Sequence, residues 1–105
     1  MDIKKQRAVK IAKSFVRFVD KHYKKIGRAY LFGSLARGRG HSGSDIDVAL
    51  ISRRFKKDAY QDQIELMKLK TNIYLSIEPH PFHPSNFVEE NPIVWEIKQH
   101  GILIK

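Results

Sequence analysis

The sequence has no cysteine among its 105 residues. Disulfide bonds, thiolate metal sites and a cysteine nucleophile are therefore excluded, and the composition fits a reducing, cytoplasmic location. No stretch approaches the roughly 20 apolar residues that a bilayer span requires. The first segment carries regularly placed basic residues in place of the apolar core of a secretion signal. We therefore expect no contact with a membrane.

Aromatic residues make up only 10% of the chain, and tryptophan occurs once. They are scattered and form no array of the kind on which single-stranded bases stack. We expect Phe15, Phe18 and Trp95 to lie in the core. Proline is also sparse, and three of the four prolines fall within residues 79–84. There they are expected to interrupt regular structure.

The length and the polar balance are those of one compact domain. Hydrophobic residues account for 42% of the chain and charged residues for 30%, which is typical of a folded globular protein. A chain of this length suffices for one hydrophobic core and leaves no room for a second. We predict a single domain over residues 1–105.

The net charge of +9 is concentrated at the start of the chain. Residues 1–28 contain ten lysines and arginines against two aspartates, a net charge of +8, whereas the other 77 residues carry +1. Apolar residues at helical spacing predict an amphipathic helix over 3–26, ended by Gly27. Its opposite face carries a basic stripe made of Lys10, Lys13, Arg17, Lys21 and Lys24. That stripe is either a solvated outer face or a docking surface for RNA or an acidic partner.

Strands and a second helix are predicted in the middle of the chain. Residues 28–32 and 45–51 have the composition of strands and are separated by a glycine-rich connection. Asp58 and Gln61 have the spacing of a capping box, and apolar residues follow them. This pattern predicts a helix over 58–70.

The last third of the chain alternates and then becomes helical. Apolar and polar residues alternate over 72–78, which predicts a strand that the following prolines end. Asn91 as a cap and Pro92 at the first helical position then predict a helix that ends at Gly101. A terminal strand is expected at 102–104.

The connection between the first two strands contains two groups suited to chemistry. Gly33 lacks a Cβ, so its backbone can approach a phosphate, which the hydroxyl of Ser34 and nearby N–H groups can hold. A helix beginning at Ser34 would point its positive end at that anion. Asp45 and Asp47 lie two residues apart on a strand, so both carboxylates project from one face, and such oxygen ligands favour Mg²⁺. Ser44 can fix a carboxylate or a phosphate through its hydroxyl.

Together these residues form the pattern Gly33-Ser34-x-x-Arg37-Gly38 followed by Ser44-Asp45-x-Asp47. The pattern resembles the signature of the nucleotidyltransferase superfamily, which includes DNA polymerase beta, kanamycin nucleotidyltransferase and the minimal nucleotidyltransferases. The resemblance to the minimal nucleotidyltransferases extends over essentially the whole chain. It implies an α/β fold in which a small mixed β-sheet carries the carboxylates on one face and helices pack on the other.

The resemblance also implies a metal site. Asp45 and Asp47 would bind two Mg²⁺ ions, and a third carboxylate on a later strand would complete the catalytic set. The matching position is Glu78, for which a surface glutamate is the alternative interpretation. As a general base, Glu78 would accept the proton of an acceptor hydroxyl.

The nucleotide-binding residues that the resemblance implies are Gly33, Ser34, Arg37 and Ser44. Arg37 would pair with phosphate oxygens, and Arg39 is either a second such residue or a solvated one. Tyr74 is the aromatic residue that could neighbour the nucleotide base. His80 and His83 could form a metal site with the third carboxylate, but histidines among prolines more often have a structural role.

The implied reaction transfers a nucleoside monophosphate from an NTP, with ATP as the family-level expectation, to a hydroxyl acceptor. Minimal nucleotidyltransferases are often paired with a helical HEPN protein in a toxin–antitoxin module, so we expect such a partner, with a tyrosine hydroxyl as one candidate acceptor. The alternatives are a catalytically weak or inactive nucleotide-binding subunit that neutralises its partner by binding, and a basic RNA-binding module. The acceptor, the preferred base and the formation of a homodimer stay open.

Overall fold

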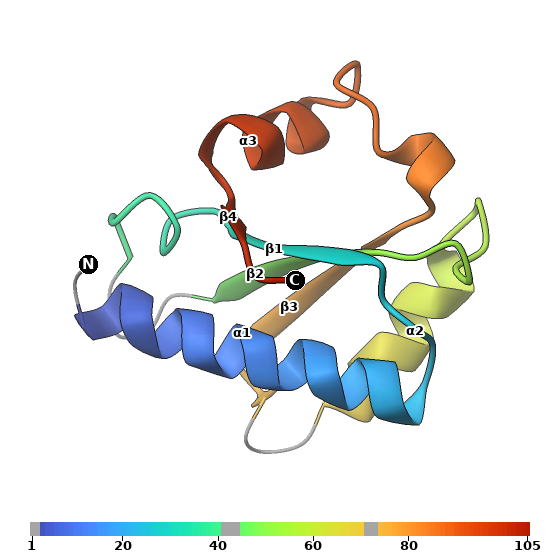
Figure 1. Cartoon of the computed structure of the whole chain (residues 1–105), viewed down its shortest axis with the longest axis horizontal. Coiled ribbons are helices and arrows are strands. Elements are labelled where there is room, and N and C mark those ends of the chain that lie inside the picture. The colour runs from blue at the N-terminus through green and yellow to red at the C-terminus, as the bar shows by residue number, and fades with distance from the viewer. Residues whose placement is uncertain (1–2, 41–44, 71–73) are drawn as a thin grey trace.

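The computed structural model describes residues 3–40, 45–70 and 74–105, which form an α/β structure (Figure 1). Its elements are α1 (Ile3–His22), β1 (Arg28–Phe32), β2 (Ile46–Ile51), α2 (Tyr60–Leu69), β3 (Ile77–Phe82), the short 3₁₀ helix η2 (Pro84–Asn86), α3 (Pro92–His100) and β4 (Ile102–Leu103). Within the described ranges, no helix is both long enough and apolar enough to cross a membrane.

The four strands form one mixed sheet in the order β3-β2-β1-β4. β1 runs antiparallel to both β2 and β4, whereas β3 runs parallel to β2. A parallel pair needs a crossover connection, which α2 provides between β2 and β3. The predicted α/β class with a small mixed sheet is therefore confirmed.

The helices α1 and α2 cover one face of the sheet (Figure 1). The main core lies between them and the strands, where Phe15 and Val19 of α1 meet Leu66 of α2. From the sheet, Leu31 and Val48 project into the same cluster and are fully buried. This part of the arrangement agrees with the expectation that helices pack on one face.

The helix α3 packs on the opposite face of the sheet (Figure 1). Its residue Ile97 is fully buried in a second cluster with Phe32 and Ala49. The expectation of helices on one face therefore holds for α1 and α2 and not for α3. The reason is that apolar strand residues also project from this face and must be covered. Asp47 shares the face with Ala49, because the two are two residues apart on β2.

The third strand begins later than predicted and continues through two prolines. Residues 74–76 form turns, and β3 spans Ile77–Phe82. The prediction of a strand over 72–78 is therefore right for residues 77 and 78, wrong for residues 74–76, and wrong in ending the strand at the prolines. Residues 71–73 lie outside the described ranges.

The edge position of β3 explains why it tolerates proline. Among the described strands, β3 pairs with β2 alone. The Ile46 N–H donates to the Ser76 carbonyl at 2.8 Å, and the Ser52 N–H donates to the Phe82 carbonyl at 3.1 Å. Even-numbered residues of β3 thus direct their backbone groups toward β2. Pro79 and Pro81 direct theirs away from it, where a missing N–H removes no bond of the sheet.

The two later helices begin differently from one another. At α3 the Asn91 side chain accepts the Ile93 N–H at 3.0 Å, so the predicted cap is confirmed. At α2 the cap position is Ala59, whose side chain makes no capping bond. Asp58 accepts the Tyr60 N–H at 3.2 Å from one residue earlier. The predicted capping box is therefore wrong, although the aspartate still supports the helix start.

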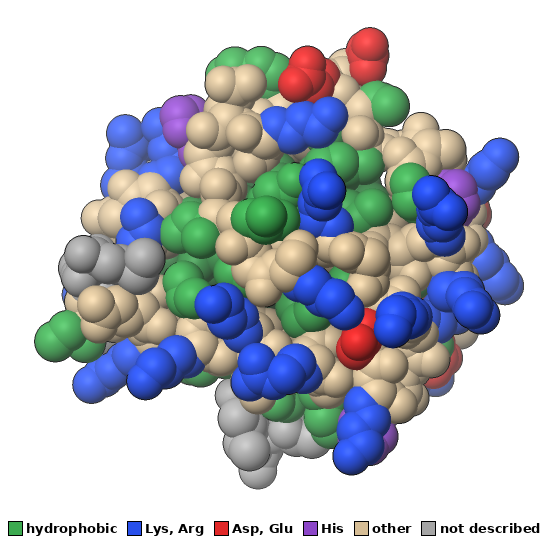
Figure 2. All heavy atoms as spheres, in the orientation of Figure 1, with side chains coloured by type: hydrophobic (Ala, Val, Ile, Leu, Met, Phe, Trp, Pro, Cys, Tyr) green, Lys and Arg blue, Asp and Glu red, His purple; other side chains and the backbone are tan. Residues whose placement is uncertain are grey.

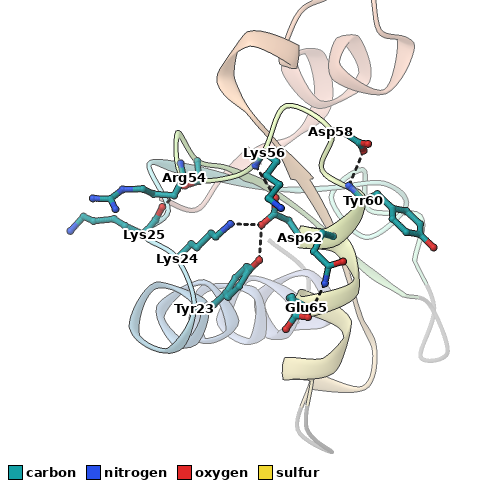
Figure 3. Close-up of polar contacts among 11 residues, drawn as sticks. Tyr23, Lys24, Lys25, Arg54, Lys56, Asp58, Tyr60, Asp62 and Glu65 are labelled. Carbon is teal, nitrogen blue, oxygen red and sulfur yellow. Dashed lines mark hydrogen bonds and ion pairs between the residues drawn. The ribbon is translucent and has the colours of Figure 1, made fainter.

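A buried carboxylate joins the end of α1 to α2 (Figure 3). α1 stops at His22 instead of residue 26, and the following chain turns toward Asp62, which is 1% exposed. The Tyr23 hydroxyl, the Lys24 ammonium and the Lys56 backbone N–H donate to its oxygens at 2.6, 2.7 and 2.8 Å. Burial raises the pKa of Asp62, but these hydrogen bonds outweigh burial and hold that pKa below its ordinary value. Burial and the neighbouring carboxylate raise the pKa of the Tyr23 hydroxyl.

We predict that Asp62→Asn lowers the free energy of unfolding by about 2 kcal/mol at neutral pH, because hydrogen bonds to a buried charge are lost. The lowered pKa means that the stabilisation is present above the unfolded pKa and is lost as the pH falls below 3.8, the ordinary aspartate value. The difference between wild type and variant should therefore shrink in acid. Urea unfolding followed by circular dichroism, at neutral pH and at a pH below 3.8, measures this difference in unfolding free energy.

The matched control is Asp58→Asn, which removes an exposed aspartate from the same connection and keeps an oxygen for the Tyr60 N–H. It should change the unfolding free energy little at either pH. An Asp62→Asn variant as stable as this control would contradict the role given to the buried carboxylate.

Candidate functional site

Gly33 follows β1 directly and lies against a carboxylate of β2. The β1–β2 register pairs Phe32 with Asp47, so the turn that leaves β1 passes beside the Asp47 side chain. Gly33 has a φ of 79°, a conformation that favours glycine. A Cβ at this position would also overlap Oδ2 of Asp47. The predicted glycine is thus required both by its backbone conformation and by its contact with the carboxylate.

Residues 34–38 form a hydrogen-bonded turn. The Arg37 N–H donates to the Gly33 carbonyl at 3.2 Å, and the Arg39 N–H donates to the Ser34 carbonyl at 2.8 Å. The two apolar residues between Ser34 and Arg37 are buried and anchor the turn in the core. The structure does not form the helix that would begin at Ser34. Instead the turn leaves Ser34 exposed, directly after the glycine that lies against Asp47.

The Arg37 side chain reaches from this turn to α3. Its Nη1 lies 3.1 Å from Oε1 of Glu96, and both side chains are 32% exposed. An exposed ion pair of this kind contributes little to stability, because water and salt screen it. The guanidinium is therefore held near the turn by a pairing that another anion can replace.

Two carboxylates and an imidazole meet where β2 and β3 begin. The parallel register pairs Asp47 with Glu78, and His80 lies two residues further on the same face of β3. One potential ligand atom of each residue lies within 4.8 Å of the others. The Asp47 side chain is 23% exposed, and Glu78 is exposed. Two carboxylates held this close repel one another, so the arrangement favours a bound cation.

His80 is a member of the cluster that the sequence analysis named as an alternative and did not favour. Its Nε2 lies 3.1 Å from Oδ1 of Asp47. His83, in contrast, accepts the Ser85 N–H through Nδ1 at 3.1 Å and caps η2. A structural role is therefore confirmed for His83, whereas His80 lies beside the two carboxylates. Continuing the two-residue alternation past the first proline of β3 would have placed His80 beside the carboxylates.

Asp45, one of the predicted metal ligands, is not part of this cluster. Asp45 lies just before β2 and is exposed. Strand alternation puts it on the same side as Asp47, but its carboxylate is not among the grouped ligand atoms of the described residues. Ser44 lies outside the described ranges. The roles of Asp45 and Ser44 stay predictions.

Two aromatic residues lie where the sequence did not predict them. Tyr74 is 7% exposed on the face opposite the carboxylates, where its hydroxyl lies 2.7 Å from Ser14 Oγ and its ring packs on Phe15 at 5.3 Å between centroids. The prediction that it neighbours the nucleotide base is therefore wrong, because Tyr74 belongs to a turn and not to the alternating strand. Trp95, predicted to lie in the core, is 47% exposed on α3.

Known proteins resemble this chain in family and in fold. The chain matches the nucleotidyltransferase domain family over residues 12–102, whereas no curated protein matches it. The crystal structure of a candidate nucleotidyltransferase from Sulfolobus solfataricus superposes with a TM-score of 0.68 at 21% identity, over 95% of this chain and 81% of that chain. This likeness shows the shared fold. Because the family match covers most of the sequence, the protein belongs to the nucleotidyltransferase domain family.

Proposed function

We propose that this protein is a Mg²⁺-dependent enzyme that transfers AMP from ATP to a hydroxyl group of a partner protein. Its family accounts for nucleotidyl transfer in general. One observation supports the finer proposal: the β2–β3 register sets Asp47 opposite Glu78, next to the turn at Gly33. Ligands for a cation and a close approach to the backbone therefore occur together at one end of the sheet.

The donor set fits Mg²⁺. This ion prefers carboxylate oxygens, keeps several waters and takes its other ligands from substrate phosphates. Asp47 and Glu78 offer such oxygens within one cluster, and we propose that Asp45, just before β2, adds another. Imidazole suits Mg²⁺ less well, so His80 fits better as the hydrogen-bond partner that orients the Asp47 carboxylate. When bound, one or two Mg²⁺ ions would offset the charge on the phosphoryl oxygens.

The turn after β1 is suited to the triphosphate. Gly33 allows the backbone to approach phosphate oxygens, and the exposed Ser34 can donate its hydroxyl to them. Arg37 is paired with Glu96 across the surface. A phosphate would compete well for this guanidinium, because it forms charged hydrogen bonds in a forked geometry.

The proposed reaction is a displacement at the α-phosphate of the NTP. The acceptor oxygen forms a bond to the α-phosphorus, the bond from that phosphorus to the bridging oxygen breaks, and pyrophosphate leaves. Glu78 takes the proton of the acceptor hydroxyl. Because Glu78 is exposed, a hydroxyl carried by a large molecule can reach it.

The acceptor is proposed to belong to a helical partner of the HEPN class, with this chain acting as its antitoxin. This partner would present the hydroxyl to Glu78, and a tyrosine side chain would suit an exposed base. A cytoplasmic location, where ATP and Mg²⁺ are available, stays a prediction.

Asp47→Asn keeps the size of the side chain and removes its charge, so we expect Mg²⁺-dependent NTP binding to weaken about tenfold or more. Calorimetric titration of each of the four NTPs in Mg²⁺ and in EDTA measures this and names the preferred base. Asp58→Asn is the matched control and should bind like the wild type. Equal affinity for Asp47→Asn and the control would contradict the proposed metal site.

Transfer separates the enzyme from an inactive binding subunit. ATP labelled on its α-phosphate should leave label on a co-purified HEPN-type partner with the wild type and not with Asp47→Asn. If the wild type leaves the partner unlabelled and Asp47→Asn still neutralises it in cells, the protein acts by binding alone and the enzymatic proposal fails.

Gly33→Ala and Gly38→Ala test the contact between the turn and Asp47. Both glycines have a positive φ, 79° and 74°, so each variant should lose about 1–2 kcal/mol of stability. A Cβ at Gly38 meets nothing within 4 Å, whereas one at Gly33 overlaps the Asp47 carboxylate. Only Gly33→Ala should therefore lose Mg²⁺-dependent NTP binding in calorimetry. An equal loss in both variants would mean that the turn conformation matters and the carboxylate contact does not.

A further inference from the structure

A second group of charged side chains surrounds a hollow at the other end of the sheet. The hollow has a volume of about 480 Å³, which is in the range of nucleotide-sized pockets. Four basic side chains line it, from Lys25, Arg28, Arg53 and Arg54. Apolar groups, among them Ile51, form part of its wall.

This hollow is separate from the carboxylate cluster. Arg28 pairs with Ile51 at one end of the β1–β2 ladder, and Phe32 pairs with Asp47 at the other. Ile51 lies four residues beyond Asp47 on β2, a distance of about 13 Å at the usual rise of a strand. A ligand of the hollow would therefore bind outside the site assigned to the triphosphate.

Hydrogen bonds hold the segments around the hollow together. Ser52 is 1% exposed, and its hydroxyl donates to the Lys25 carbonyl and accepts the Arg54 N–H. The Gly27 N–H donates to the Ile51 carbonyl at 2.9 Å. The connection after α1 and the connection after β2 are thus fixed to each other, and the four basic side chains project from a defined frame.

The positive charge around the hollow is not balanced within the described part of the chain. None of the four basic side chains forms an ion pair with a described carboxylate. Asp20, which feels the charge of Lys25, already accepts the Ile26 N–H and pairs with Lys105. Figure 3 shows Lys25 and Arg54 side by side, both pointing away from the Asp62 cluster.

The hollow continues the basic surface of α1. Lys10, Lys13, Arg17 and Lys21 are exposed along this helix, whose end leads within a few residues to Lys25. Figure 2 shows Lys and Arg side chains spread along the lower part of the molecule, over α1, and at the right-hand end, with an acidic side chain between the two groups. A ligand with several negative charges would be attracted along the whole of this face.

We propose that the hollow and the α1 stripe bind the phosphate backbone of an RNA strand, independently of base sequence. Three of the four basic residues at the hollow are arginines, whose guanidinium groups match phosphate oxygens in a fork. No aromatic ring lines the hollow, so bases would not be read by stacking. An acidic protein fits less well, because protein interfaces are centred on desolvated aromatic anchors, and no aromatic residue is among the described residues that line the hollow.

The test compares two double variants that remove the same charge. Arg53→Ala with Arg54→Ala removes two of the four basic side chains that line the hollow. It leaves in place the hydrogen bond from the Arg54 backbone N–H to the Ser52 hydroxyl. Lys57→Ala with Lys68→Ala removes two exposed lysines that do not line the hollow. Fluorescence anisotropy of a labelled oligouridylate, titrated at several salt concentrations, gives the affinity and its salt dependence.

The hollow variant should bind the oligouridylate about tenfold more weakly than the lysine control, and its salt slope should be smaller by about 0.7 for each phosphate that it no longer neutralises. Equal affinities for the two double variants, or no binding by the wild type at low salt, would overturn the proposal. Displacement of the RNA by polyglutamate at equal charge would overturn it in favour of an acidic protein.

Two further variants keep the result interpretable. Lys25→Ala changes a rim side chain that makes no described hydrogen bond, so this variant replaces the double variant if that one proves unfolded. It removes one charge in place of two, and its salt slope should therefore fall by half as much. Asp47→Asn should bind the oligouridylate as tightly as the wild type, because the carboxylate cluster lies at the other end of β2. Failure of the NTP site and failure of RNA binding are therefore distinguishable.

Discussion

The parallel pairing of β2 with β3 is the constraint on which the site depends. Its register sets Asp47 opposite Glu78 and brings His80 onto the same face two residues later. The antiparallel register of β1 then brings the turn at Gly33 against the Asp47 carboxylate. A shift of β3 by one residue would turn its side chains to the other face of the sheet and leave Asp47 without a second carboxylate. The crossover through α2 and its buried anchor at Asp62 support that pairing from the opposite face.

The edge position of β3 lets a strand that contains two prolines pair with β2. Pro79 and Pro81 restrict the backbone on either side of His80, and their missing N–H groups face away from β2. The same two-residue alternation that turns Pro79 and Pro81 away from β2 directs the side chain of His80 into the carboxylate cluster. Residues that usually break strands therefore hold the cluster in place.

The sheet has opposite charge at its two ends. Carboxylates gather where β2 begins, and lysine and arginine side chains surround the hollow where it ends. The basic side chains of the hollow lie too far away to neutralise the carboxylates. The proposed cation and triphosphate would therefore bind at the acidic end, and the proposed RNA strand at the basic end and along α1.

Much of the local structure followed from the sequence alone: the strand at 28–32, the capped helix after Asn91, and the glycine that leaves β1. These depend on contacts between near neighbours, where spacing and side-chain type decide the conformation. The course of β3, the inclusion of His80 and the burial of Tyr74 were decided by tertiary structure. Whether a proline can lie in a strand depends on which edge is paired, and which face a side chain occupies depends on where the strand begins. Both are set by packing between segments far apart in the chain, which spacing along the sequence does not encode.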